Sequence, residues 1–72
     1  MAKVQLLKDE SVWLGDYYVS HDNHVFYVPG RQPKPEYGIV AIMDVDEYPD
    51  PFDLNEVEKV RELLKERAYG TR

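Results

Sequence analysis

The sequence contains no cysteine, which excludes disulfide bonds, thiolate zinc sites and cysteine nucleophiles. This absence matters because a chain of 72 residues buries only about 60% of the surface of its unfolded state, which leaves a small margin of stability. Domains of this size often gain stability from a disulfide, a metal or a partner subunit. The sequence therefore predicts one domain over residues 1–72 that depends on its core or on association, as a monomer or a weak homo-oligomer.

Long apolar runs and positive charge are also scarce. No segment approaches the ~18–20 apolar residues that span a bilayer, and the first residues lack the apolar region of a signal peptide. We therefore expect a cytoplasmic protein without a membrane partner. The formal net charge is −5, and an acidic protein repels phosphate backbones, so direct binding of nucleic acid is not expected.

Aromatic and β-branched residues dominate residues 11–28 and predict a β-hairpin. Asp22 and Asn23 tolerate positive φ, so they are candidates for a two-residue turn. In that register Tyr18 lies opposite Tyr27, and the two rings form an aromatic pair on the outer face. Gly15 is expected at a bulge or at a close approach of the helix. The drier face, which we expect in the core, contains Trp13, Tyr17, Val19, Phe26 and Val28.

Three further segments complete the predicted sheet region. Residues 3–7 are expected to form an edge strand. Residues 29–36 contain three prolines, which favour an extended loop, and this loop is basic through Arg31 and Lys34. Residues 38–45 are an almost continuous apolar run, which predicts a central strand buried on both faces and paired with the hairpin.

The helix is the clearest element of the sequence. Asp53 is a natural N-cap, Glu56 three residues later completes a capping box, and Gly70 is a C-cap. Glu58 and Arg61 have the i,i+3 spacing of an ion pair. Apolar residues recur at three- and four-residue spacing and predict one buried stripe. This stripe contains Leu54, Val57, Val60, Leu63, Leu64 and Ala68, with Val60 and Leu63 at its centre.

Together these segments predict an α+β fold. We expect a three- to four-stranded antiparallel β meander over about residues 3–45, an acidic loop over 44–53, and one C-terminal helix over about 54–68. The helix should pack across one face of the sheet.

No catalytic residue is predicted. Ser20, His21 and Asp22 have the residue types of a nucleophilic triad, but they are consecutive. Neighbouring strand residues point to opposite faces, so these side chains cannot be arranged in series. A small metal-dependent enzyme would have to rest on His21, His24 and the acidic loop, and this is the third functional hypothesis.

No metal ligand or cofactor is predicted either. His21 and His24 would flank the turn on one face, but zinc normally needs three or four ligands. Asp44 and Asp46 begin like a calcium-binding EF-hand loop, yet Pro49 stands where that loop requires glycine. The two histidines are therefore expected to be polar residues beside a turn.

The acidic loop is the main functional signal. Seven carboxylates lie between Asp44 and Glu58 without a Lys or Arg. Capping and the helix dipole account for those at the start of the helix. The remaining four, expected to be exposed and to make few stabilising contacts, would be compensated by a basic partner or would serve only as solubilising charge. They are Asp44, Asp46, Glu47 and Asp50.

In size and charge profile the chain resembles the small regulators that bacteriophages encode against host enzymes. The resemblance rests on Asp44, Asp46, Glu47, Asp50, Asp53, Glu56 and Glu58 and on the chain length. It implies docking on a host enzyme that handles nucleic acid, such as RNA polymerase or a nuclease.

The sequence therefore predicts a non-enzymatic regulator or inhibitor that binds a larger basic protein through its acidic loop and exposed aromatic residues. The alternative is a homo-oligomeric structural or assembly subunit that uses the Tyr18 and Tyr27 face. The predicted partner-binding residues are Asp44, Asp46, Glu47, Asp50, Tyr18, Tyr27, Arg31 and Lys34.

Overall fold

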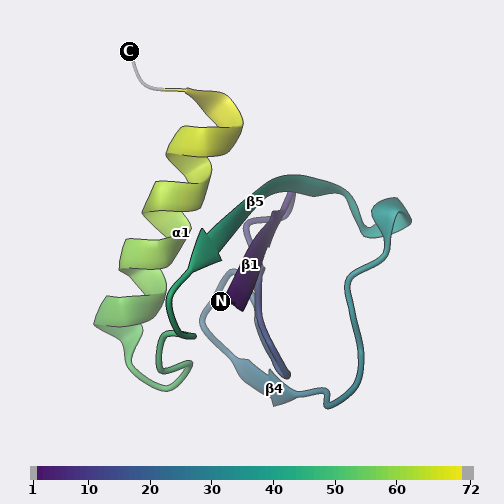
Figure 1. Cartoon of the computed structure of the whole chain (residues 1–72), viewed down its shortest axis with the longest axis vertical. Helices are drawn as coiled ribbons and strands as arrows, with labels where there is room; N and C mark the ends of the chain where they lie inside the picture. The colour runs from purple at the N-terminus through teal and green to yellow at the C-terminus, as the bar shows by residue number, and fades with distance from the viewer. Residues whose placement is uncertain (1, 71–72) are drawn as a thin grey trace.

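Five antiparallel strands and one C-terminal helix make up the computed structural model, which describes residues 2–70 (Figure 1). The predicted α+β fold is confirmed, with five strands in place of three or four. The elements are β1 (Ala2–Leu7), β2 (Val12–Leu14), β3 (Tyr17–Val19), β4 (Val25–Tyr27), the 3-10 helix η1 (Pro35–Tyr37), β5 (Ile39–Val45) and α1 (Leu54–Tyr69).

The strand order in the sheet is β4-β3-β2-β1-β5. The chain forms a meander through β4, and β5 then returns to pair with β1. The predicted positions of the first and last strands are therefore wrong, because β1 is interior and β5 is an edge. Val4 and Leu6 of β1 are fully buried, whereas Ile42 of β5 is 47% exposed. An apolar run in a short strand does not by itself distinguish two buried faces from one buried face.

The β1–β2 and β3–β4 connections share one geometry. In the first, the Leu7 N–H donates to the Ser11 carbonyl at 2.9 Å and the Glu10 N–H donates to the Leu7 carbonyl at 2.9 Å. In the second, Ser20 and His24 occupy the positions of Leu7 and Ser11. This is a type I turn followed by one residue in the left-handed region, here Glu10 (φ 70°) and Asn23 (φ 68°).

The longer turn changes the register of the predicted hairpin by one residue. Tyr18 pairs with Phe26, and Tyr17 pairs with Tyr27. The predicted pairing of Tyr18 with Tyr27 is wrong, and the two rings lie on opposite faces of the sheet because a one-residue shift exchanges the faces.

Residues 11–20, expected as one strand, form two strands joined by a tight turn at Gly15. Gly15 has a φ of +69°, and a Cβ at this position would lie 2.8 Å from the ring of Tyr48. The predicted bulge or close approach of the helix at Gly15 is therefore wrong, because Gly15 lies in a turn and the residue close to it belongs to the loop before α1.

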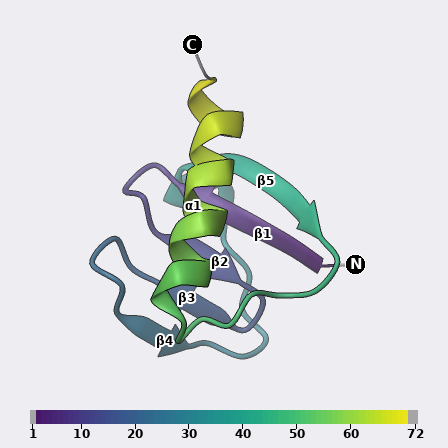
Figure 2. The same cartoon turned by 90° about the vertical axis from the view of Figure 1, so that its left-hand side faces the viewer.

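The core lies between the sheet and α1, which crosses the strands on one side (Figure 2). Of the hairpin residues expected in the core, only Val19 belongs to this cluster. Tyr17 shares its face but lies outside the cluster. The turn at Gly15 places Trp13 on the opposite face, and the register shift does the same to Phe26. The buried cluster consists of Val4, Leu6, Val12, Leu14, Val19, Ala41, Val57, Val60 and Leu64.

The helix begins and ends where the sequence predicts. The Asp53 carboxylate accepts hydrogen bonds from the N–H groups of Asn55 (3.0 Å) and Glu56 (3.4 Å). The predicted capping box is wrong, because the Glu56 side chain accepts from the Asp50 N–H at 3.3 Å, while the Asp53 N–H donates to the Asp50 carbonyl at 3.1 Å. Gly70 is the C-cap, and its N–H donates to the Glu66 carbonyl at 2.7 Å.

The buried face of α1 is narrower than the predicted stripe. Leu54 and Leu63 are 54% and 46% exposed, so their predicted burial is wrong. At about 100° per residue, Leu63 lies roughly 120° around the helix from Val57. The position that the sheet covers instead belongs to Arg61, which is 3% exposed.

Arg61 joins both left-handed turns to the helix, and we call this arrangement the Arg61 clamp. Its Nε donates to the Glu10 carbonyl at 2.8 Å, and Nη2 donates to the Ser20 carbonyl at 3.0 Å. Nη1 donates to the Asn23 side-chain oxygen at 3.0 Å and to Glu58 at 2.8 Å. The predicted Glu58–Arg61 ion pair is therefore confirmed, and it is one part of a larger network.

Candidate functional site

The predicted partner-binding residues lie on two different sides of the molecule. Tyr18, Arg31 and Lys34 line a groove on the sheet face opposite α1. Tyr27 belongs to a ring cluster that reaches the acidic loop. The structure thus separates basic and acidic candidates that the sequence analysis assigned to one binding function.

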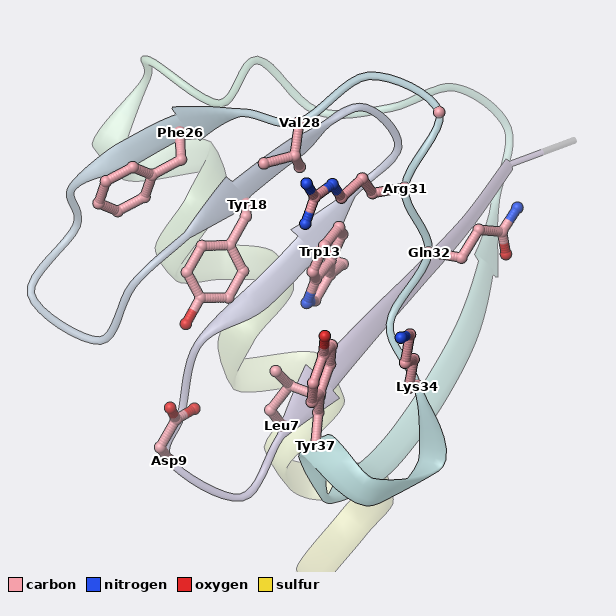
Figure 3. Close-up of a pocket in the computed structure, with 11 residues that line it drawn as sticks. Leu7, Asp9, Trp13, Tyr18, Phe26, Val28, Arg31, Gln32, Lys34 and Tyr37 are labelled. Atoms are coloured by element: carbon pink, nitrogen blue, oxygen red, sulfur yellow. The ribbon is translucent and has the colours of Figure 1, made fainter.

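The first surface is a groove of about 800 Å³ (Figure 3), which we call the aromatic groove. The loop over residues 28–38 forms one wall, and the outer face of the sheet forms the floor. The groove is defined by Leu7, Asp9, Trp13, Tyr18, Phe26, Val28, Gly30, Arg31, Gln32, Lys34 and Tyr37.

A row of aromatic rings crosses this floor because cross-strand partners share a face. Trp13 of β2 pairs with Tyr18 of β3, and Tyr18 pairs with Phe26 of β4. The ring centroids are 5.3 Å apart for the first pair and 5.9 Å apart for the second. Phe26 is 49% exposed, so this row is partly open to solvent at the edge strand.

Charged groups flank the row on two sides of the groove. Arg31 and Lys34 are exposed on the loop wall, and Asp9 lies on the opposite side (Figure 3). Asp9 accepts hydrogen bonds from the hydroxyl of Ser11 at 2.5 Å and from its N–H at 3.0 Å. The hydroxyl bond, with smaller help from the N–H, lowers the pKa of Asp9 below 3.8 despite partial burial.

Trp13 carries the unusual polar atom of the groove. Its side chain is almost fully buried, and within residues 2–70 its indole Nε1 has no hydrogen-bond partner. Buried tryptophan N–H groups usually find an acceptor, because an unpaired buried donor is costly.

The second surface joins carboxylates to exposed rings. Phe52, near the end of the acidic loop, is 68% exposed and makes an edge-to-face contact with Tyr17 at 5.6 Å. Tyr17 in turn contacts Tyr27, which is 64% exposed, at 5.2 Å. We call this the acidic–aromatic surface, defined by Tyr17, Tyr27, Asp46, Glu47, Asp50 and Phe52.

The four loop carboxylates differ in their roles, although all are exposed. Asp44 is part of β5 and pairs with Lys3 at 3.1 Å. Asp50 accepts from the Phe52 N–H at 2.9 Å and thereby fixes the turn that presents this ring. The side chains of these two therefore make one stabilising contact each, within the few that the sequence predicts. Asp46 and Glu47 make no side-chain hydrogen bond within the part of the chain that the structure describes, so their charge is free of local pairing.

The histidine turn lacks the geometry of a triad. The Ser20 hydroxyl donates to the Asp22 carboxylate and to the His24 backbone carbonyl (3.4 Å), not to an imidazole ring. His24 Nδ1 lies 3.8 Å from Asp22. Across residues 2–70, no group of three or more histidine or carboxylate side chains is placed to hold a metal ion.

The two serine–aspartate contacts predict a response to acid. The Ser20 hydroxyl lowers the pKa of Asp22 below 3.8, as the Ser11 hydroxyl does for Asp9. A carboxyl group whose pKa is lowered by folding contributes stability above its unfolded pKa and loses that contribution as the pH falls through its folded pKa. We expect the melting temperature to fall as the pH decreases below 3.8.

Thermal melts of wild type and of the Asp9→Asn/Asp22→Asn variant would measure this contribution. The variant should be less stable at neutral pH and should lose less on acidification. Asp46→Asn, exposed and without a side-chain hydrogen bond among the described residues, is the control and should follow the acid response of wild type. Parallel curves for wild type and the double variant would contradict this assignment.

Comparisons with known proteins add no family. No protein-family model matches the chain, and searches of curated proteins and of solved structures find no match. No helix in the described part of the chain, α1 included, is long and apolar enough to cross a membrane.

Proposed function

We propose that this protein is a non-enzymatic regulator that binds a larger protein with a basic surface through its acidic–aromatic surface. The observation that carries the proposal is Phe52, a ring 68% exposed beside the acidic loop and continuous with Tyr17 and Tyr27. The Asp50 side chain holds the turn that presents this ring.

The two components of this surface contribute differently to binding. Unpaired carboxylates such as Asp46 and Glu47 increase the rate of encounter with a basic partner and select its orientation. Exposed aromatic rings supply contact area, and aromatic residues are enriched in protein interfaces. The proposed partner is therefore a larger protein with a basic surface that contacts nucleic acid, such as a transcription enzyme or a nuclease.

A homo-oligomer remains the second candidate, on a different basis from the one expected from the sequence. Tyr18 and Tyr27 do not share a face, so they cannot form one interface. The seven-residue β5 is instead an edge of the sheet, and an edge strand can pair with a second copy. Size-exclusion chromatography with mass measurement at low micromolar concentration separates the two candidates.

Neutralising the unpaired carboxylates tests the regulator proposal. We expect the Asp46→Asn/Glu47→Gln variant to keep or slightly raise its melting temperature, because mutual repulsion is removed. Its association rate and affinity for a partner captured from host lysate should both fall. Wild-type affinity should weaken as the salt concentration rises to physiological strength, and the variant should respond less.

Glu62→Gln/Glu66→Gln is the matched control, because it removes the same charge from the C-terminal half of α1, away from the acidic loop. This variant should bind like wild type. If both double variants lose affinity equally, the effect comes from the net charge of the protein and not from the acidic loop. If Asp46→Asn/Glu47→Gln binds like wild type, the acidic loop is not part of the interface. Phe52→Ala tests the ring separately. It should increase the dissociation rate constant more than it decreases the association rate constant.

A further inference from the structure

We propose that the aromatic groove is a second binding site, chemically opposite to the acidic–aromatic surface. Its occupant is an extended segment of a partner protein in which an aromatic or apolar side chain neighbours a carboxylate. Three features of the groove support this: a row of rings, a buried donor without an acceptor, and two cations on one wall.

The rings provide the apolar half of the recognition. Trp13, Tyr18 and Phe26 form a continuous row across three adjacent strands, with centroid separations of 5.3 and 5.9 Å. The row ends at β4, an edge strand, so a chain lying across the strands can leave the groove there. The rings are tilted against one another by 56° and 38°, and such surfaces accept aromatic and aliphatic side chains at offset or edge-to-face contacts.

The indole of Trp13 provides the polar half. Its Nε1 is buried and has no acceptor among the described residues, and Figure 3 shows it on the groove side, near the rings of Tyr18 and Tyr37. An acceptor from a ligand would remove the cost of this unpaired donor. Because Nε1 is buried, a neighbouring side chain must shift first, and the ring of Tyr37, 45% exposed on the one-turn η1, is suited to do so.

The charged residues of the groove favour a carboxylate as the ligand group that accepts from Trp13. Arg31 and Lys34 lie on the loop wall, and Asp9 is the single acidic residue that lines the groove, on its other side. This favours one anion near the loop end. A nucleic-acid backbone is disfavoured because it requires many cations, whereas the groove offers two and the chain carries a net charge of −5. A carboxylate in a protein segment fits both the rings and the cations.

Trp13 is the only tryptophan in the chain, so its indole N–H resonance reports directly on the groove. The probe is a short synthetic peptide of Phe-Glu pairs with glycine spacers, titrated into the isotope-labelled full chain. We expect a saturable downfield shift of this resonance, as for a donor that gains an acceptor. The matched Phe-Gln peptide should bind about tenfold more weakly, because it lacks the charge-assisted hydrogen bond. An oligodeoxythymidine of similar length should produce no shift.

Variants separate the contributions, with affinity measured by anisotropy of the labelled peptide. Trp13→Phe keeps the ring and removes the donor, and it should lose about tenfold in affinity. Arg31→Gln/Lys34→Gln changes only exposed side chains and should remove most of the salt dependence. Lys59→Gln/Arg67→Gln makes the same charge change on exposed positions of α1 and should bind like wild type.

Three results would overturn the proposal: equal binding of the Phe-Gln peptide, tighter binding of the oligonucleotide, or no shift of the Trp13 resonance at millimolar peptide. If Trp13→Phe fails to fold, the exposed Arg31/Lys34 variant still decides the outcome. The Asp46→Asn/Glu47→Gln variant should not lose affinity for this peptide, so failure of the groove and failure of the acidic–aromatic surface can be distinguished.

Discussion

The Arg61→Ala variant is expected to lose about 3–5 kcal/mol of unfolding free energy, because it removes a buried guanidinium and the hydrogen bonds that it donates to the carbonyl groups of two turns. Arg61 is 3% exposed and donates four hydrogen bonds, which reach two turns and one carboxylate. Without the guanidinium, the carbonyl groups of Glu10 and Ser20 lose their side-chain donor. Small domains have about 5 kcal/mol or little more in total, so the variant should be largely unfolded at room temperature.

Denaturant titration followed by circular dichroism measures this loss. Arg67→Ala is the control, since Arg67 is exposed on the same helix and should change stability by less than about 0.5 kcal/mol. Arg61→Lys should also be destabilised, because a single ammonium group cannot reproduce the planar set of donors. A melting temperature for Arg61→Ala close to that of Arg67→Ala would mean that the clamp contributes little.

Leu64→Ala is expected to cost about 2–5 kcal/mol, the usual range for truncating a buried leucine. Leu64 is fully buried against the sheet, so its removal leaves a cavity in a core of few residues. Leu63→Ala is the matched comparison, with the same chemical change on the adjacent residue. Leu63 is 46% exposed and should lose less than half as much.

This pair tests the orientation of α1 directly. Equal losses for the two variants would place both leucines in the core, as the sequence alone predicts, and would contradict the observed rotation of the helix. A larger loss for Leu63→Ala would reverse the assignment. Thermal melts of both variants under one set of conditions are sufficient.

The elements that could be predicted from the sequence are those with local signals. The helix and its caps depend on Asp53, Gly70 and a 3.6-residue period, all of which act within a few residues of one another. The strand order depends on which surfaces are covered, and this is decided by distant residues. The apolar run of β5 therefore predicted a strand correctly, but the predicted central position of that strand in the sheet is wrong.

The candidate sites were predicted less well, because a single residue in the turn determines both faces of the hairpin. Asn23 at a φ of 68° lengthens the turn, and this moves Tyr27 away from Tyr18 and places Phe26 beside it. A local signal existed, since the turn before β2 also has Asp at its third position, Asp9, matching Asp22. The unpaired Trp13 nitrogen and the exposure of Phe52 have no counterpart in sequence periodicity.

The clamp also orders events during synthesis of the chain. Both turns hold a non-glycine residue in the left-handed region, which is an unfavourable conformation for Glu10 in particular. The guanidinium that bonds to these turns lies some forty to fifty positions later in the sequence, so a ribosome releases all five strands before it. Until α1 emerges from the ribosome, the apolar face of the strands is therefore uncovered and their turns lack the hydrogen bonds of Arg61. Folding should be completed only after α1 has emerged, and chaperone contact with the strands until then is the expected cellular consequence.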